Sequence, residues 1–287
     1  MTDKTSRPSS GRNSFAEWVN RNSITNFILF SFGFSYLIGG AFYFWVTQFS
    51  ADLPYVLSLY AARMLIVIGP AVGAISVSYL IGGGRGVRCL LQKLIPRKRH
   101  VGWWLILPLL GTSITFISFL IGGLSLDSLS AILADGWGLF ILHLLIQILL
   151  IGIGEELGWR GWLLPKLAQR FPLGVSMLLI FIVWTLWHFP ILLMGADIVV
   201  PWILVAISAT IILTWIWIKV KGNVFVLAIA HASINGSQFF IENQIGQEQN
   251  LLLLESWRIT GYIYLAVGIL FLFLLRYSLA KKVDPID

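Results

Sequence analysis

The sequence predicts an all-α, polytopic integral membrane protein with about eight transmembrane helices and both termini in the cytoplasm. Of its 287 residues, 57% are hydrophobic and only 11% are charged, which leaves too few polar side chains to cover a water-soluble protein of this length. The 13 tryptophans fit the same class, because indole rings favour the membrane interface. The apolar residues form runs of about 20, the length that a helix needs to cross a bilayer, and lack the short alternating segments of a barrel.

Eight apolar segments are long enough to cross a membrane, or nearly so. In order, the expected spans are 24–47, 55–82, 101–123, 137–164, 173–194, 201–219, 223–241 and 259–278. The seventh is the weakest, because it is short and carries polar residues. We expect a tail over 1–22, a membrane domain over 23–280 with its motifs in 150–236, and a second tail over 281–287. The first tail is predicted to be solvated, with an amphipathic turn near Phe15–Val19 as the alternative.

Basic residues gather in alternate loops, and this pattern predicts the orientation. They lie in the N-terminal tail, in 83–100, in 160–170, at 219–221 and after 275, whereas the intervening loops are acidic, with Arg258 as their one basic residue. The positive-inside rule then places both termini and the basic loops in the cytoplasm; we expect the bacterial cell membrane. The net charge of +7 is spread over loops beside the membrane, so lipid is an expected partner and nucleic acid is not.

Polar side chains within the spans are the most informative residues, because each costs several kcal/mol unless it faces a partner or a cavity. Three groups stand out. They are Glu155, Glu156 and Arg160 in IGIGEELGWRGWLLP, His188 in VWTLWHFP, and His231 with Asn235 in IAHASINGS. His143, about three turns before the glutamates, is expected to be structural.

Helical geometry separates the two glutamates. At about 100° per residue, Glu156 and Arg160 lie on one face, one turn apart, which suits an ion pair. Glu155 points away from that face, so it is free to meet neighbouring helices. A structural ion pair would need only Glu156 and Arg160. Glu155 therefore calls for a second explanation.

The three groups are expected to meet. Phe171-Pro172 marks a hairpin tip between the fourth and fifth spans, and equal lengths on either side of it bring Glu155 level with His188. His231 and Asn235 share one face of the seventh span, and His231 lies roughly 12–15 Å from its cytoplasmic end at about 1.5 Å per residue. The sequence therefore predicts one buried cavity that opens to the cytoplasm.

Such a set of side chains suits hydrolysis of a peptide bond. A buried glutamate can take a proton from water, and a neutral histidine can orient that water and later protonate the leaving amine. A second histidine and an asparagine amide can hold a developing oxyanion. An alternative is a divalent metal such as Zn²⁺ on Glu155, His188 and His231, a usual catalytic zinc set, although no HExxH pattern is present. A metal-free glutamate mechanism stays open beside it.

These residues also resemble a known family. EELGWR fits the motif EExxxR, WTLWH resembles FxxxH with Trp184 in the first place, and HASIN fits HxxxN, in the order found in the CPBP family. That family comprises type II CAAX prenyl endopeptidases and bacteriocin-processing or immunity proteins. The resemblance implies an intramembrane endopeptidase acting on a prenylated (CAAX-type) or small hydrophobic peptide. It also assigns roles: water activation to Glu155 and His188, the oxyanion site to His231 and Asn235, and bracing or substrate positioning to Glu156 and Arg160.

Two other functions compete with the peptidase. A non-catalytic protein of the same fold would confer bacteriocin immunity or act as a scaffold, with the polar residues serving stability and recognition. A proton-coupled transporter would also use buried Glu and His, but the sequence lacks the internal repeats and paired broken helices of that class. The sequence sets no oligomeric state.

Overall fold

The computed structural model describes residues 10–49, 55–246 and 249–282, and this part of the chain is helical, with no β-strand. Within it, seven helical segments are long and apolar enough to cross a membrane. They are Ser23–Phe49, Tyr60–Leu94, Lys98–Ile121, Leu126–Arg170, Ala196–Lys219, Val224–Ile245 and Asn250–Leu275. A shorter apolar helix, Leu173–Trp187, accompanies them. The predicted polytopic all-α membrane fold is confirmed, as expected where backbone groups have no water to bond.

The spans consist of shorter helical elements. In chain order the α-helices are α1 (Ser10–Arg21), α2 (Ser23–Gly33), α3 (Gly40–Phe49), α4 (Tyr55–Val67), α5 (Gly69–Leu91), α6 (Val101–Ile121), α7 (Leu126–Ile146), α8 (Ile153–Gly158), α9 (Leu164–Arg170), α10 (Leu173–Trp187), α11 (Phe189–Leu192), α12 (Ala196–Lys219), α13 (Val224–Ile245) and α14 (Asn250–Leu275). The π-helical turns are η1 (Phe34–Gly39), η4 (Gln147–Gly152) and η5 (Trp159–Leu163).

The first helix lies in the segment predicted to be a solvated tail. Residues 1–9 fall outside the described part of the chain, but α1 includes the whole of the Phe15–Val19 turn that was the alternative. Val19 is fully buried, while Phe15 and Trp18 are each about half exposed. The segment is therefore an amphipathic helix with one side packed on the protein.

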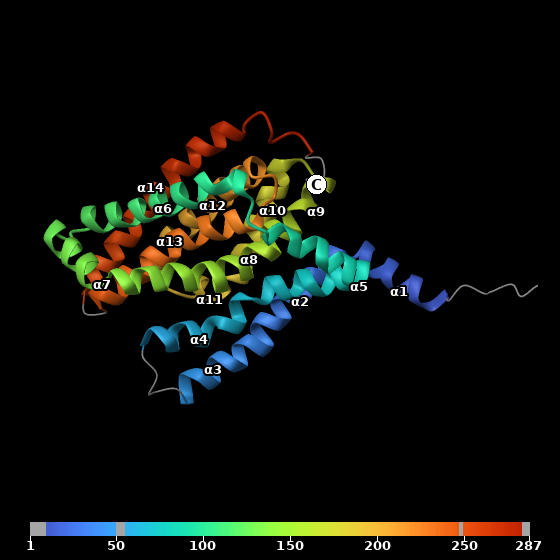
Figure 1. Ribbon diagram of the computed structural model, residues 1–287, viewed down its shortest axis with the longest axis horizontal. Coiled ribbons are helices and arrows are strands. Elements are labelled where there is room, and N and C mark those ends of the chain that lie inside the picture. The colour runs from blue at the N-terminus through green and yellow to red at the C-terminus, as the bar shows by residue number, and fades with distance from the viewer. Residues whose placement is uncertain (1–9, 50–54, 247–248, 283–287) are drawn as a thin grey trace, which may run out of the picture.

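The span predicted to be weakest, α13, is the centre of the bundle. In its most apolar window 78% of the residues are buried, against 22–39% in the other six spans. The helix packs against α6, α7, α8 and α12, and Figure 1 shows it running between them. Low hydropathy here reflects a helix surrounded by protein, where polar side chains find partners that lipid does not offer.

The basic loops meet at one end of the bundle. The Lys93 ammonium donates to the Gly161 carbonyl oxygen at 2.7 Å, which joins the end of α5 to η5. The Asn223 amide donates to the Ile95 carbonyl oxygen at 2.9 Å, which joins the start of α13 to the same basic loop. These loops, which have the same predicted parity, therefore lie at one end of the bundle.

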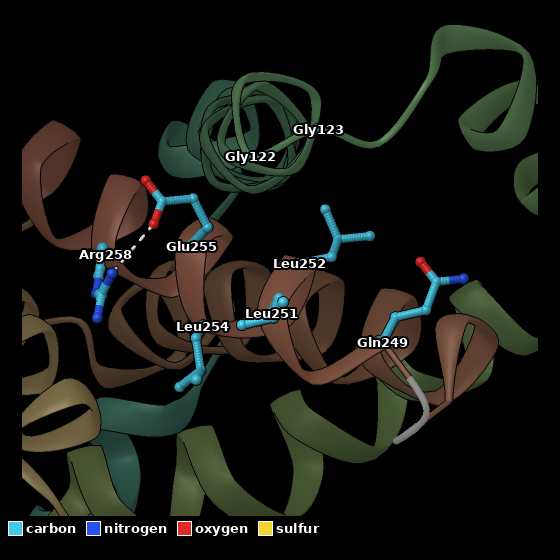
Figure 2. Close-up of a pocket in the computed structure, with 8 residues that line it drawn as sticks. All are labelled: Gly122, Gly123, Gln249, Leu251, Leu252, Leu254, Glu255 and Arg258. Carbon is cyan, nitrogen blue, oxygen red and sulfur yellow. Dashed lines mark hydrogen bonds and ion pairs between the residues drawn. The ribbon is translucent and has the colours of Figure 1, made fainter.

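The acidic loops meet at the other end. Arg258, the one basic residue predicted there, pairs with Asp197 at 2.5 Å and with Glu255 at 3.3 Å. An open hollow of about 470 Å³ lies beside Glu255 and Arg258, and Figure 2 shows the side chains that line it. The residues that line it are Gly122, Gly123, Gln249, Leu251, Leu252, Leu254, Glu255 and Arg258. None of the polar motif residues belongs to this hollow.

Candidate active site

The EELGWR motif lies where its helix changes winding, because EELG belongs to α8 and WR to the π-helical turn η5. α8 is only six residues long and is enclosed by η4 before it and η5 after it. A π-helical turn inserts extra backbone into a helix, and such turns are frequent at functional sites. The two turns re-aim the side chains before and after α8, a change that a constant rotation per residue does not predict.

Two glycines let neighbouring helices approach the motif closely. A Cβ atom on Gly152 would lie 2.6 Å from the Ala228 carbonyl oxygen of α13, and one on Gly158 would lie 2.5 Å from the Pro70 carbonyl oxygen of α5. Both distances are too short for any larger residue without a shift of backbone. The glycines on each side of the glutamates thus bring α8 against α5 and α13, so that its side chains reach those helices directly.

Glu156 joins two helices through one oxygen atom. Its Oε1 accepts a hydrogen bond from Arg160 Nη1 at 2.8 Å, and His231 Nδ1 lies 2.8 Å from the same atom. Glu156 and Arg160 are fully buried, and His231 is 7% exposed. The predicted ion pair on one face of the helix is therefore present. The bond from His231 of α13 was not predicted, and it makes Glu156 the link between α8 and α13.

Glu155 turns to a different helix. Its Oε2 accepts a hydrogen bond from the indole Nε1 of Trp184 in α10 at 2.9 Å. Glu155 is 3% exposed and Trp184 is 6% exposed. The expectation that Glu155 meets a neighbouring helix is therefore confirmed. Trp184 lies one turn before His188, so Glu155 lies near the level of His188, as the equal lengths on either side of Phe171-Pro172 predicted.

His188 lies at the end of α10, between α10 and α11. Its Nδ1 lies 2.9 Å from the Trp184 carbonyl oxygen. Since a carbonyl can only accept, Nδ1 carries the proton and the neutral ring keeps an acceptor at Nε2. Trp187 and Trp202 contact the same ring, with centroids 4.7 and 5.0 Å away. His188 is half-buried, so it is more open than the carboxylates.

Trp184 brings most of the motif residues together. The Arg160 guanidinium carbon lies 4.8 Å from the centre of the indole ring. The imidazoles of His188 and His231 meet that ring edge-on, with centroids 5.5 and 5.8 Å away. With the bond to Glu155, the indole contacts four motif residues, one of them on α13. The predicted convergence of the fourth, fifth and seventh spans is thus present around one side chain.

Asn235 stands apart from this cluster. It lies one turn beyond His231 on α13 and is half-buried. Among the described residues its amide has no hydrogen-bond partner. The sequence predicted a cavity open to the cytoplasm, whereas the structure packs protein around the two carboxylates. Glu155, Glu156 and Arg160 are all nearly or fully buried. His188 and Asn235 are the more accessible members of the set.

Supporting residues from the first span were not predicted. Trp187 Nε1 donates to Ser35 Oγ at 2.9 Å, and the Tyr36 hydroxyl donates to the Trp187 carbonyl oxygen. Both partners belong to η1, a third π-helical turn. The signal in the sequence is weak, because Ser35 and Tyr36 are two of several polar residues in this span, among them Asn26 and Ser31. Ser35 and Tyr36 fix the end of α10 from which His188 projects.

A separate polar cluster lies about three turns before the glutamates. The Tyr60 hydroxyl and His143 Nδ1 are 2.8 Å apart, and Gln147 Nε2 donates to the same hydroxyl at 3.3 Å. His143 is fully buried. These contacts fit the structural role expected for His143 and join α4 to α7.

The residues proposed as zinc ligands do not form a metal-binding set here. Among the described residues, no group of three or more His, Cys, Asp or Glu side chains is arranged to hold a metal ion. Glu155 bonds to Trp184, His231 bonds to Glu156, and His188 faces tryptophan rings. A zinc site on Glu155, His188 and His231 stays a prediction, beside the metal-free glutamate mechanism.

Part of the chain, including the motif residues, is similar to known proteins. Residues 136–237, which contain all of the motif residues, match the family described as Type II CAAX prenyl endopeptidase Rce1-like. CAAX prenyl protease 2 of Methanococcus maripaludis is 30% identical over 105 residues, which cover 33% of this chain. The match spans 39% of that relative's length. The family resemblance predicted from the three motifs is thus confirmed, and residues 136–237 are the part of this chain that is similar to the Rce1-like type II CAAX prenyl endopeptidases.

Proposed function

We propose that this protein is an intramembrane endopeptidase that hydrolyses a peptide bond in a prenylated (CAAX-type) or other small hydrophobic, membrane-associated peptide. The observation that carries the proposal is the gathering of Glu155, His188 and His231 around the Trp184 ring, inside a bundle of apolar helices. The match to the endopeptidase family over the same residues supports it.

Glu155 and His188 activate the water in this proposal. Glu155 Oε2 is held by Trp184, which leaves Oε1 to take a proton from water. His188 donates from Nδ1 to the Trp184 carbonyl oxygen, so Nε2 of its neutral ring can accept from the same water and orient it. The hydroxide attacks the scissile carbonyl carbon, and the proton taken by Glu155 passes to the leaving amine when the C–N bond breaks.

His231 and Asn235 stabilise the oxyanion that forms on the carbonyl oxygen. Because the Glu156 carboxylate accepts from His231 Nδ1, the ring can donate to the oxyanion only as an imidazolium, through Nε2. The Asn235 amide, one turn along the same helix, supplies a second donor. Glu156 and Arg160 position His231 and brace α8 against α13.

The proposed orientation places this apparatus in the inner half of the bacterial cell membrane, open to the cytoplasm. The cluster of basic loops that includes Lys93 lies at one end of the bundle, and the positive-inside rule puts that end in the cytoplasm. Membrane lipid surrounds the bundle, and the substrate is a peptide or lipidated peptide that reaches the site from this side.

The decisive experiment uses the full chain purified in detergent, with a prenylated CAAX peptide and an unmodified hydrophobic peptide as substrates. Glu155→Gln keeps the shape of the side chain and removes the base, so we expect cleavage to fall by about 100-fold or more. Glu255→Gln is the matched control, because this exposed glutamate lies at the opposite end of the bundle. Cleavage by E155Q at the rate of E255Q would refute the peptidase.

One observation favours the non-catalytic alternative, immunity or scaffolding by the same fold. Glu156 and Arg160 are fully buried, as a purely structural brace would be. Under this alternative, protection against a bacteriocin would survive alanine at both His188 and His231. Under the peptidase proposal, the same double variant loses cleavage while its abundance in the membrane is retained.

A further inference from the structure

The indole N–H of Trp184 is the one donor from the protein that bonds to the Glu155 carboxylate among the described residues. We propose that Trp184 is a positioning residue, which aims the carboxylate of Glu155 at the water. This inference rests on the proposed peptidase function and gives a role to Trp184, the first residue of the second motif, to which the resemblance assigned none.

The bond is of a kind that fixes a direction. Its length is 2.9 Å, it joins a neutral donor to a carboxylate, and both side chains are more than nine-tenths buried. Hydrogen bonds to a charged acceptor are stronger than neutral ones, and a low-dielectric surrounding strengthens them further. With Oε2 held in this way, the carboxylate cannot rotate freely, and Oε1 keeps one orientation toward the site.

The indole itself is held from another side. The Arg160 guanidinium lies over its ring, with the carbon atom 4.8 Å from the centre, and Arg160 is tied to Glu156 at 2.8 Å. A cation over an indole face is the strongest of such contacts with aromatic rings. The order of contacts is therefore Glu156 to Arg160, Arg160 to Trp184, and Trp184 to Glu155. Two glutamates that are adjacent in the chain are linked through a side chain of another helix.

The ring and the N–H group have separable roles. Phenylalanine, which the family motif carries at this place, keeps an aromatic ring that can contact Arg160 and both histidines, but it has no donor for Glu155. Trp184→Phe therefore removes the aiming bond and preserves most of the packing. Trp217→Phe is the matched control, because Trp217 is 2% exposed in α12 and its side chain makes no hydrogen bond or ring contact with a motif residue in the described part of the chain.

The experiment measures kcat and KM for the full chain in detergent, with the prenylated peptide as substrate. We expect W184F to lower kcat by about 10- to 100-fold and to change KM by less than about twofold, as for loss of an interaction that aligns a catalytic group. W217F keeps both constants. Equal kcat for W184F and W217F, or a rise in KM that accounts for the whole effect, would overturn the positioning role.

A spectroscopic measurement tests the contact itself. In the protein labelled with isotope-enriched tryptophan, the indole N–H signal of Trp184 is the one missing from W184F. It should move when Glu155→Gln replaces the carboxylate with an amide, while the signal missing from W217F stays in place. An unmoved Trp184 signal overturns the inference. If E155Q cleaves normally, the peptidase proposal fails instead; if E155Q is inactive and W184F fully active, only the role of Trp184 is lost.

Discussion

Glu155 and Glu156 are adjacent in the chain, yet their carboxylates bond to different helices. Glu155 accepts from Trp184 of α10 at 2.9 Å, whereas Glu156 lies 2.8 Å from His231 of α13. Consecutive residues of a helix point about 100° apart, so a double glutamate is the shortest sequence that can reach two neighbouring helices at one level. The different partners fit the separate roles that we propose for the two acids, a chemical one for Glu155 and a structural one for Glu156.

Loss of His231 should greatly reduce the rate of peptide cleavage and have a smaller effect on the stability of the fold. His231→Ala removes the proposed oxyanion donor and leaves Glu156 with Arg160 as its partner, so we expect at least about a 100-fold loss of kcat/KM. Peptide cleavage and thermal unfolding in detergent measure the two effects. His143→Ala is the control: it breaks the bond to Tyr60 and should lower Tm, with kcat of the folded protein kept. Equal losses of activity in both variants would contradict the assignment.

The contributions of Glu156 and Arg160 to the free energy of unfolding should be coupled. Glu156→Gln leaves the buried guanidinium of Arg160 without its charge partner, and Arg160→Gln does the converse. Removing one member of a buried pair costs about 3–5 kcal/mol. The double variant should be destabilised by less than the sum of the two, by a margin on the order of 1–3 kcal/mol. Denaturant unfolding of the four proteins measures this margin, and strict additivity would show that the two side chains do not interact.

The close approach of α8 to α5 should depend on Gly158. A Cβ atom there would lie 2.5 Å from backbone and side-chain atoms of Pro70, so Gly158→Ala must separate the helices and should lower stability by about 1–3 kcal/mol. Gly82→Ala is a suitable comparison, because a Cβ at Gly82 meets no other atom within 4 Å. Unfolding in detergent distinguishes them. A Tm for G158A equal to that of G82A would show that the helices can move apart freely.

Cys89 offers a test of the orientation. It is the one cysteine of the chain and is exposed near the basic end of α5. A thiol reagent that cannot cross membranes should label it in inverted vesicles and leave it unlabelled in intact cells. Leu251, which is 84% exposed at the start of α14, should show the reverse in the variant C89S/L251C. The opposite pattern for both cysteines would invert the proposed topology.

Metal dependence is open to direct measurement. Since the described His, Glu, Asp and Cys side chains form no metal-binding group, we expect peptide cleavage to persist after EDTA treatment and elemental analysis to find less than one zinc per chain. Inactivation by EDTA that added Zn²⁺ reverses would show that Glu155, His188 and His231 rearrange around a metal.

Much of the fold could be predicted from hydropathy, because a helix that crosses a membrane is a long run of apolar residues in the sequence. The residues at which each span begins and ends were harder to predict. The fourth span was expected at 137–164, but the helical segment covers Leu126–Arg170. Asp127 and Asp135 suggest a loop, whereas the structure has a helix that begins after a Ser125 cap, whose Oγ accepts from the Ser128 backbone N–H. Local capping chemistry, rather than polarity, decides where that helix starts.

The candidate site was predictable in its members and less so in its bonds. The spacing of Glu156 and Arg160 fixes their ion pair, because both lie on one helix. The partner of His231 depends on how α13 sits against α8, which close contacts at Gly152 determine and no spacing reveals. From the sequence, Trp184 is only an aromatic ring one turn before His188. The hydrogen bond from its indole N–H to Glu155 depends on how α10 packs against α8, which the sequence does not reveal.

The central place of α13 has a consequence for biosynthesis. His231 and Asn235 come from a helix that begins at Val224, after the ribosome has already made both glutamates and His188. A nascent chain that has not yet reached this point holds only part of the proposed catalytic set. If the protein is the peptidase that we propose, the order of synthesis alone would keep the unfinished chain inactive.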